Sequence, residues 1–366
     1  MRDVLDELLD WVRTGQRVGL ATVVGTWSSA PRQPGAAMIV GPDATVVGSV
    51  SGGCVEGAVY DLATEVRASG QPVLQRYGVS DDDAFAVGLT CGGTIEMFVE
   101  AVDQATFPEL IEVGEDIRAG RAVAVATVLN GPRAGAHLVL RPEAMTLGSL
   151  GSNRLDDAVR DDALGLLSQG STAVLHYGPD GERRGDDIAV FVASYAPKPR
   201  LIVFGAIDFA AAVAKVGAFL GYAVTVCDAR PIFATAKRFP DADEVVIEWP
   251  HKYLARTDVD ERTVVCVLTH DPKFDVPLLE VALRLPLAYV GAMGSRRTTD
   301  DRLKQLRELG LTEEELSRLH APIGLDLGAR TPEETAVSVA AEIVGARWGG
   351  SSVPLVRVDG PIHHGT

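Results

Sequence analysis

Residues 48–57 read GSVSGGCVEG, and they join an expected strand to an expected helix. The overlapping run ATVVGSV, at 44–50, is rich in β-branched residues, which favour a strand. After Cys54, apolar residues recur with a period near 3.6, which is typical of a helix with one buried face. The stretch therefore predicts a strand, a double-glycine turn that carries Cys54, and a helix.

Cys54 is expected at or next to the N-terminus of this helix. Orphan N–H groups and the helix macrodipole favour anions there, so the position favours a thiolate, the form that attacks or ligates. Gly52 and Gly53 allow positive φ and let a ligand approach the backbone closely. The alternative is a tight turn with a buried cysteine, because a free cysteine is often a small core residue. This stretch alone leaves both interpretations open.

An internal repeat organises the first half of the chain. Two pairs of segments match: RVGLATVV (17–24) with RAVAVATV (121–128), and GAAMIVGPDATVVGSV (35–50) with GAHLVLRPEAMTLGSL (135–150). Helix and strand patterns are kept in both copies. We therefore expect an α+β domain over 1–196 that contains one scaffold twice, at about 17–101 and 121–194.

The two copies differ where chemistry is expected. The first copy reads SGGC at 51–54, and the second reads GSNR at 151–154. The TCGG of residues 90–93 has no counterpart in the second copy. The repeat is thus an internal control, because the scaffold does not require these cysteines and double glycines. This comparison favours a functional role for Cys54 and Cys91.

In the second half, after a short linker at 196–200, apolar strands alternate with helices. Over 201–348 this alternation indicates a doubly wound parallel sheet of the Rossmann type. The expected strands are 201–206, 223–228, 244–248, 263–270 and 288–295, and the expected helices include 208–220, 297–309 and 333–345. The Gly/Ser/Pro-rich tail over 349–366 is expected to be peripheral.

The loop after the first of these strands departs from the dinucleotide fingerprint G-x-G-x-x-G. Gly205 is kept, but Ile207 replaces the glycine that lets the backbone approach the phosphates, and Asp208 adds negative charge. Asp228, at the end of the next strand, suits a ribose 2′-hydroxyl, although acidic residues are common at strand ends without a ligand. NAD(P) is therefore an alternative ligand and not the expected one.

Gly294, Ser295 and Arg296 make a better prediction of an anion site. Glycines and a serine precede a helix here, and Arg296 and Arg297 can make bidentate contacts with phosphate. The alternative is a glycine turn with two solvated arginines, and the sequence leaves both open. The histidine and cysteine spacings are not those of zinc sites, so we predict no metal site.

The bulk composition excludes several classes of protein. The chain has 366 residues, of which 46% are hydrophobic and 23% charged, as in ordinary soluble proteins of two or three domains. A net charge of −16 argues against a nucleic-acid-binding surface, and no apolar run is long enough to span a membrane. Four cysteines do not make a disulfide framework, so we expect reduced thiols and a cytoplasmic protein.

Five stretches in order resemble the XdhC/CoxI family of xanthine dehydrogenase accessory proteins. They are GTWSSAPRQPGAAMIV (25–40), GSVSGGCVEGAVYDLA (48–63), LTCGGTIEMFVE (89–100), YVGAMGSRRT (289–298) and APIGLDLGARTPEETAVSVAAEI (321–343). The resemblance runs from about residue 10 to 348. It implies a chaperone that binds molybdenum cofactor, supports its sulfuration with a cysteine desulfurase, and passes it to a molybdenum hydroxylase of the xanthine dehydrogenase type. It also implies a Rossmann-like C-terminal domain.

The resemblance also suggests site residues. It places Cys54 and Cys91 near the molybdenum or dithiolene of the cofactor, with Cys91 as a second ligand or a persulfide relay. It also places Ser51, Gly52 and Gly53 around that pocket and Arg32 on the cofactor's phosphate. Gly92 and Gly93 beside Cys91, and from the loops discussed above Gly205, Asp228, Gly294, Ser295 and Arg296, complete the residues expected to bind a cofactor. Ile207 and Asp208 depart from the GAGHVG often found in the family. That departure weakens a nucleotide role for the second domain.

We therefore expect a cofactor chaperone, more an insertion factor than an enzyme, and a homodimer. The label xanthine dehydrogenase would follow family association only, because the cysteines cannot supply iron–sulfur clusters. The rival interpretation is an NAD(P)-dependent oxidoreductase, with Asp228 on the ribose and His270 or Cys54 as the acid or base. A third is a structural adaptor without a ligand. Cys227 and Cys266 lie in apolar strands and are expected in the core.

Overall fold

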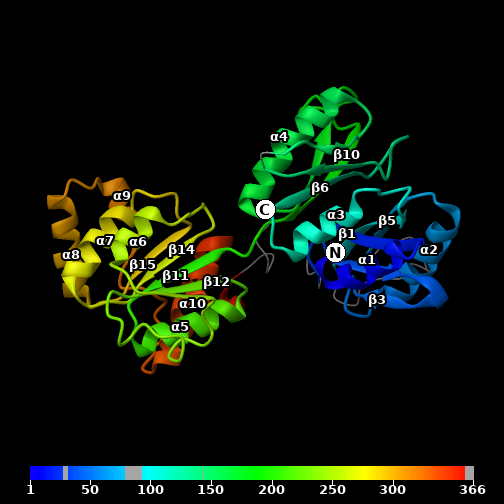
Figure 1. Cartoon of the computed structure of the whole chain (residues 1–366). Coiled ribbons are helices and arrows are strands. Elements are labelled where there is room, and N and C mark those ends of the chain that lie inside the picture. Colours follow the sequence, from blue (N-terminus) through cyan, green and yellow to red (C-terminus); the bar gives the residue numbers. More distant parts are fainter. Residues whose placement is uncertain (28–31, 79–92, 143, 359–366) are drawn as a thin grey trace. The chain divides into compact units, whose positions relative to one another are not determined.

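A computed structural model of the chain describes residues 1–27, 32–78, 93–142 and 144–358 (Figure 1). The chain divides into two compact units, one from Met1 to Pro197 and one that begins at Lys198. Each unit is described separately below.

The first unit contains two five-stranded antiparallel sheets with the same strand order. The first sheet has the order β3-β2-β1-β5-β4, formed by β1 (Val18–Trp27), β2 (Ala37–Val40), β3 (Val46–Gly48), β4 (Val73–Tyr77) and β5 (Thr94–Val102). The second has the order β8-β7-β6-β10-β9, formed by β6 (Val123–Val128), β7 (His137–Leu140), β8 (Leu147–Gly148), β9 (Ala173–Tyr177) and β10 (Ile188–Tyr195). The two copies of the sequence repeat thus fold with one topology.

The two sheets pack face to face, and each has a helix on its outer face. Side chains alternate along each strand, so in β5 Phe98 and Val102 join the core between the sheets, while Met97 and Val99 pack under a helix. That helix is α2 (Glu56–Ser69) on the first sheet, and α4 (Asn153–Gln169) covers the second. The shared core also includes η1 (Arg2–Val4), α1 (Leu5–Arg13) and α3 (Leu110–Arg118), while η2 (Pro42–Ala44) lies in the β2–β3 turn.

The second unit is a six-stranded, wholly parallel sheet with helices on both faces, which confirms the predicted Rossmann-like fold. Its order is β13-β12-β11-β14-β15-β16, formed by β11 (Arg200–Phe204), β12 (Ala223–Cys227), β13 (Glu244–Val246), β14 (Val264–Val267), β15 (Tyr289–Ala292) and β16 (Leu319–His320). One face packs against α5 (Asp208–Phe219) and α10 (Pro332–Trp348); the other packs against α6 (Pro250–Arg256), α7 (Pro272–Ala282), α8 (Arg296–Glu308) and α9 (Glu313–Ser317). The strand order reverses between β11 and β14, which is where such sheets bind ligands.

Three short elements of this unit, α6, α9 and β16, are additions to the sequence-based expectation. The strand expected over 263–270 is shorter, because β14 ends at Val267 and residues 268–270 lie outside regular secondary structure before α7. Beyond α10, the described tail holds a single 3-10 turn, η3 (Leu355–Arg357).

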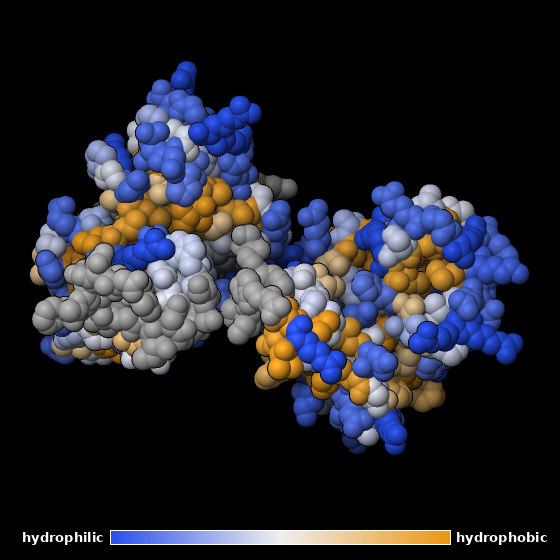
Figure 2. All heavy atoms as spheres, turned by 180° about the vertical axis from the view of Figure 1, so that it is seen from behind, coloured by the Kyte–Doolittle hydropathy of each residue, from blue (hydrophilic) through white to orange (hydrophobic). Residues whose placement is uncertain are grey.

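Apolar side chains remain exposed on both units (Figure 2). On α10, Val337, Val344 and Trp348 are 53%, 41% and 54% exposed, and their spacing places them along one side of the helix. Within the ranges described above, the helices are too short or too polar to cross a lipid bilayer.

Candidate functional site

The loops that carry the predicted cofactor-binding residues of the first unit leave one end of the first sheet. β1 ends at Trp27 opposite Thr94, the first residue of β5. At the same end, Met38 near the start of β2 pairs with Gly48, the last residue of β3. The end of β1 at Trp27, the turn after β3 that holds Cys54, and the start of β5 at Thr94 therefore lie at one end of the sheet. This convergence follows from antiparallel pairing alone.

The turn before α2 is closed around one carboxylate, that of Glu56 at the start of the helix. Glu56 Oε1 accepts hydrogen bonds from Ser49 Oγ at 2.8 Å and from the Ser51 N–H at 2.9 Å. Its Oε2 accepts from Ser51 Oγ at 2.5 Å and from the Gly53 N–H at 2.8 Å. Burial opposes the charge, but these hydrogen bonds outweigh it and lower the pKa of Glu56 from 4.5 to about 2.

The N–H groups of this turn are therefore largely used within the chain. Besides the two bonds to Glu56, Ser51 Oγ accepts from the N–H groups of Cys54 at 3.0 Å and Val55 at 3.1 Å. The expectation that orphan N–H groups would favour a thiolate at Cys54 loses its basis here, since Ser51 and Glu56 occupy those donors. What remains is the position of Cys54: half-buried, two residues before α2, and packed at the edge of the core under that helix.

Gly52 and Gly53 adopt left-handed backbone conformations, with φ of +76° and +116°. A Cβ atom on either would have no described residue within 4 Å, so among these residues the conformation and not crowding requires glycine. The surface of the turn beside Cys54 is thus bare backbone. A ligand could approach it without meeting a side chain of either residue.

The second copy shows what the scaffold does without this site. Ser149 Oγ donates to Asp156 at 2.7 Å, as its counterpart Ser49 does to Glu56, and the Leu150 N–H also donates to Asp156 at 2.7 Å, where the first copy uses the Ser51 N–H instead. However, α4 begins at Asn153, the counterpart of Gly53 at an offset of one hundred, whereas α2 begins at Glu56. Both helices end at corresponding glycines, so α2 is three residues, nearly one turn, shorter at its N-terminus. The open turn with Cys54 occupies the place of that missing helical turn.

The other predicted residues of this region are placed only in part. Arg32 forms an ion pair with Asp3 at 2.8 Å, and its buried Nε has no acceptor among the residues that the structure describes. Gly93 is buried just before β5. Cys91 and Gly92 lie outside the described residues, so their assignment stays a prediction.

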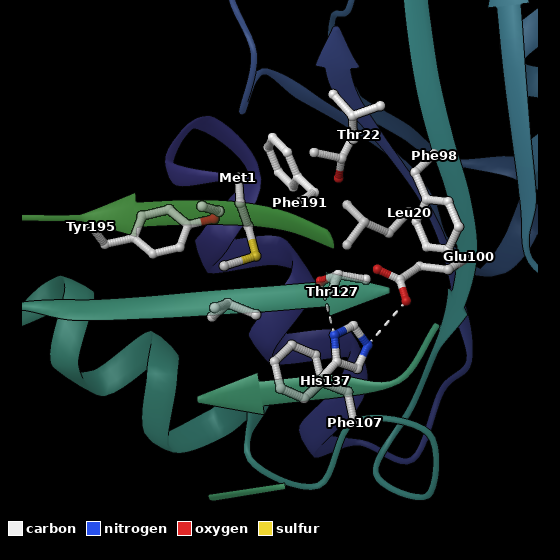
Figure 3. A pocket seen from close by; sticks show the side chains of 13 residues that line it. Met1, Leu20, Thr22, Phe98, Glu100, Phe107, Thr127, His137, Phe191 and Tyr195 are labelled. Carbon is white, nitrogen blue, oxygen red and sulfur yellow. Dashed lines mark hydrogen bonds and ion pairs between the residues drawn. The ribbon is translucent and has the colours of Figure 1, made fainter. Parts of the chain in front are cut away.

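Sequence reasoning missed a polar cluster between the two sheets (Figure 3). His137 Nε2 lies 3.0 Å from Glu100 Oε2, and His137 Nδ1 lies 3.1 Å from Thr127 Oγ1. The ring of Phe107 stacks on the imidazole with centroids 4.0 Å apart. The cavity beside them is about 30 Å³, enough for one or two water molecules and far too small for a pterin.

This cluster joins the two copies and breaks their symmetry. The strand register makes Ala37 the counterpart of His137. Ala37 pairs with Thr22 in the first sheet, and His137 pairs with Thr127 in the second. By the same register, Ala193 is the counterpart of Glu100. One polar pair thus replaces a pair of alanines across the interface. Aligning the repeats residue by residue would have exposed both substitutions.

The glycine turn of the second unit is filled by the chain's own groups. The Asp228 carboxylate accepts the Ala206 N–H at 2.7 Å and is also bound by the guanidinium of Arg230 at 2.8 and 2.9 Å. Burial opposes the charge on Asp228, but these donors lower its pKa. Gly205 has φ of +108°, and a Cβ there would lie 2.8 Å from Thr269 Cγ2. These contacts leave no free carboxylate for a ribose, and they argue against a pyrophosphate at this turn.

The remaining predicted residues have simple environments. Ser295 caps α8, accepting from the Thr298 N–H at 3.1 Å, and Arg296 is exposed. Cys227 and Cys266 are fully buried in β12 and β14, and burial raises the pKa of each thiol to about 12. Among the described residues, no three His, Cys, Asp or Glu side chains converge as a metal site would require.

Comparison with known proteins gives matches along most of the chain. A family model described as "XdhC and CoxI family" matches residues 11–78 and 116–178, and one described as "XdhC Rossmann domain" matches 201–343. The chain is 28% identical to a probable subunit of xanthine dehydrogenase from Bacillus subtilis, over 94% of this chain and 96% of that protein. It is also 28% identical to "Molybdenum cofactor insertion chaperone PaoD" of Escherichia coli, over 94% and 88%. A crystal structure described as a xanthine dehydrogenase from Bacillus halodurans is 27% identical, with a TM-score of 0.67 over 96% of this chain and 98% of that one.

Proposed function

Because the chain belongs to the XdhC and CoxI family, we propose that it is a molybdenum cofactor chaperone that serves a molybdenum hydroxylase. The observation that carries the proposal is the open turn at Cys54, which the first copy of the repeat has and the second lacks. A scaffold present twice, with a cysteine in a bare glycine turn in one copy only, supports a binding role for that copy.

The chemistry of the turn suits this cargo. Thiolate is a soft ligand that binds transition metals, and Cys54 stands at the edge of the core beside the unobstructed backbone of Gly52 and Gly53. Arg32 lies in a loop at the same end of the sheet, and its buried Nε is available for an anionic group. We assign Arg32 to the cofactor's phosphate and Cys54 to its sulfur and molybdenum side. Cys91 would be a second ligand or a relay.

Sulfuration is the finer part of the proposal. A persulfide on a cysteine desulfurase would transfer its outer sulfur to the Cys54 thiolate. The new S–S bond forms as the old one breaks, and the desulfurase thiolate leaves, so no external oxidant or reductant is needed. The cytoplasm keeps thiols reduced, as this transfer requires, and we place the protein there.

The assembly and the second unit complete the proposal. We expect a homodimer, and the exposed apolar side of α10 at Val337, Val344 and Trp348 is the surface we assign to it. An NAD(P)-dependent oxidoreductase is disfavoured, because Asp228 is bound to Arg230 and Ala206. The chain is thus proposed to act as an insertion factor and not as an enzyme.

The test compares the two copies of the repeat. Purified protein is mixed with molybdenum cofactor and separated from free ligand, and the retained pterin is quantified for wild type, Cys54→Ser and Arg154→Ser. Arg154 is the counterpart of Cys54 in the second copy, so Arg154→Ser is the matched control. We expect wild type and Arg154→Ser to retain pterin, and Cys54→Ser to retain at least about tenfold less, a difference of about 1.4 kcal/mol.

A second variant replaces the whole turn and tests whether its open conformation is needed for pterin retention. Replacing SGGC at 51–54 with GSNR from 151–154 should restore the missing turn of α2 while the sheet stays intact. Circular dichroism would report a folded protein, and pterin retention should be lost. A variant that folds and retains pterin like wild type would show that the Cys54 turn is not the site.

A further inference from the structure

The second unit contains a buried arginine with an unused donor. Arg302 of α8 is 3% exposed, and its Nη2 donates to Asp275 Oδ2 at 2.6 Å and to the Met293 carbonyl at 3.1 Å. Its Nη1 is also buried, and no described residue accepts from it. A buried donor without a partner is destabilising, so this nitrogen is expected to meet an acceptor that is not among the described residues.

The free nitrogen points at the N-terminus of α8. A Cβ atom placed on Gly294 would lie at ordinary contact distance from Arg302 Nη1, 3.6 Å, and from Thr298 Cβ, 3.4 Å, so both side chains border the space beside the Gly294 backbone. Ser295 and Thr298 are the next residues around this space, with their hydroxyl oxygens 2.9 Å apart. The helix has thirteen residues, so its N-terminus carries the partial positive charge of a full macrodipole.

Two further cationic side chains lie at the N-terminus of α8. Arg296 and Arg297, in the first turn of α8, are exposed, and neither has an ion pair or hydrogen bond among the described residues. Asp300 and Asp301 follow on the same helix, but neither is bonded to them.

We propose that the N-terminus of α8 binds a phosphoryl group, held by Arg302 Nη1 from below and by Arg296 and Arg297 from the solvent side. The helix N–H groups would donate to the oxygens, and arginine forks suit such tetrahedral anions. The proposal does not depend on the proposed function, because the Cys54 turn belongs to the other unit.

The surrounding groups explain why the site lies at β15 and not at the glycine turn after β11. At that turn Gly205 packs against Thr269, and Asp208, paired with Arg238 at 3.0 Å, places an acidic side chain at the start of α5. Near α8, the carboxylate of Asp275 is neutralised by Arg302 and by a hydrogen bond from the Thr269 hydroxyl, with His270 close enough to interact electrostatically. Asp271, which follows β14 and caps α7, is paired with Lys273 at 3.0 Å.

The test is a calorimetric titration of the full-length protein with inorganic phosphate, pyrophosphate and AMP. Arg302 is unsuitable as the main variant, because its loss would leave Asp275 buried and unpaired. We therefore use the double variant Arg296→Gln with Arg297→Gln, which removes two exposed charges. Lys304→Gln is the matched control, since Lys304 is an exposed cation further along α8.

Saturable binding of phosphate or pyrophosphate with one site per chain is expected, at least about tenfold weaker in the double variant and unchanged in Lys304→Gln. Tighter binding of AMP than of phosphate would identify a nucleotide as the source of the phosphoryl group, and equal binding would identify the phosphoryl group alone. The proposal is overturned if wild type does not saturate at about 20 mM ligand, above the millimolar range of weak binding. It is also overturned if both variants lose affinity equally, which would indicate general charge attraction.

Discussion

The carboxylate of Glu56 is expected to stabilise the open turn measurably, and the change Glu56→Gln tests this. The glutamine is of similar size but neutral, and its amide NH₂ would face two of the four donors that now point at Glu56. A pKa lowered from 4.5 to about 2 corresponds to roughly 3 kcal/mol at about 1.4 kcal/mol per tenfold change. Solvent screening of this partly buried group reduces the expected loss to about 2 kcal/mol.

The same pKa fixes the pH dependence. Because the folded-state pKa of Glu56 lies below its ordinary value, its stabilisation is fully present above pH 4.5 and is lost as the pH falls towards about 2. The difference in unfolding free energy between wild type and Glu56→Gln should therefore be largest near pH 7. It should shrink steadily at pH values below 4.5.

Urea unfolding of the first unit, followed by circular dichroism, measures both effects. The matched control is Asp156→Asn in the second copy, where the carboxylate accepts hydrogen bonds from Ser149 and Leu150. We expect it to lose about half as much stability as Glu56→Gln, or roughly 1 kcal/mol. Equal losses in the two variants, or a loss for Glu56→Gln that does not depend on pH, would refute the role given to Glu56.

Three other outcomes follow from the described contacts. Glu100→Ala and His137→Ala should each lower the free energy of unfolding by about 3–5 kcal/mol, because each leaves a buried polar partner unpaired. In a double-mutant cycle measured with denaturant, the double variant should lose less unfolding free energy than the sum of the two single losses. Cys227 and Cys266 should resist iodoacetamide at pH 8 in the native protein, as read by peptide mass spectrometry, because burial raises the pKa of each thiol to about 12. Asp228→Asn should lower the urea midpoint of the second unit by the equivalent of about 1–3 kcal/mol without changing pterin retention, since it weakens the bonds to Arg230 and the Ala206 N–H.

Hydropathy patterns and the repeat were sufficient to predict the fold class. Continuous apolar strands alternating with helices predicted the parallel sheet, because strands buried on both faces carry few polar residues. The short elements α6, α9 and β16 were not predicted, since five to seven residues or fewer hold too little periodicity to distinguish a helix from a loop. The predicted strand ended at residue 270, but β14 ends at Val267. The residues TH at 269–270 continue the strand-like composition, although they already belong to the connection to α7.

The site was predicted less completely, for a physical reason. The position of Cys54 before a helix follows from local sequence, whereas the carboxylate that closes the turn depends on which way Glu56 points. The spacing Ser49 to Glu56, repeated as Ser149 to Asp156, was the available signal. The His137–Glu100 contact depends on how the two sheets stack, and no local pattern reports that distance.

The two copies together explain how a closed scaffold acquires an open turn. In the second copy, the Asp156 carboxylate accepts from Ser149 and Leu150 among the described residues, and the helix supplies its own first turn. In the first copy, the side chain of Glu56 is one methylene longer and reaches the Gly53 N–H as well.

Ser51 stands where the second copy has a glycine, and its hydroxyl accepts hydrogen bonds from the N–H groups of Cys54 and Val55. The first N–H groups of a helix have no partner within the helix, so Ser51 acts as their cap. The backbone is thus satisfied without the missing turn, and the two glycines take the left-handed conformations that the shortened path requires. Since the rest of the scaffold is shared, a few side chains suffice to place the half-buried Cys54 in an open turn, and this cysteine is the feature that scaffold stability alone does not explain.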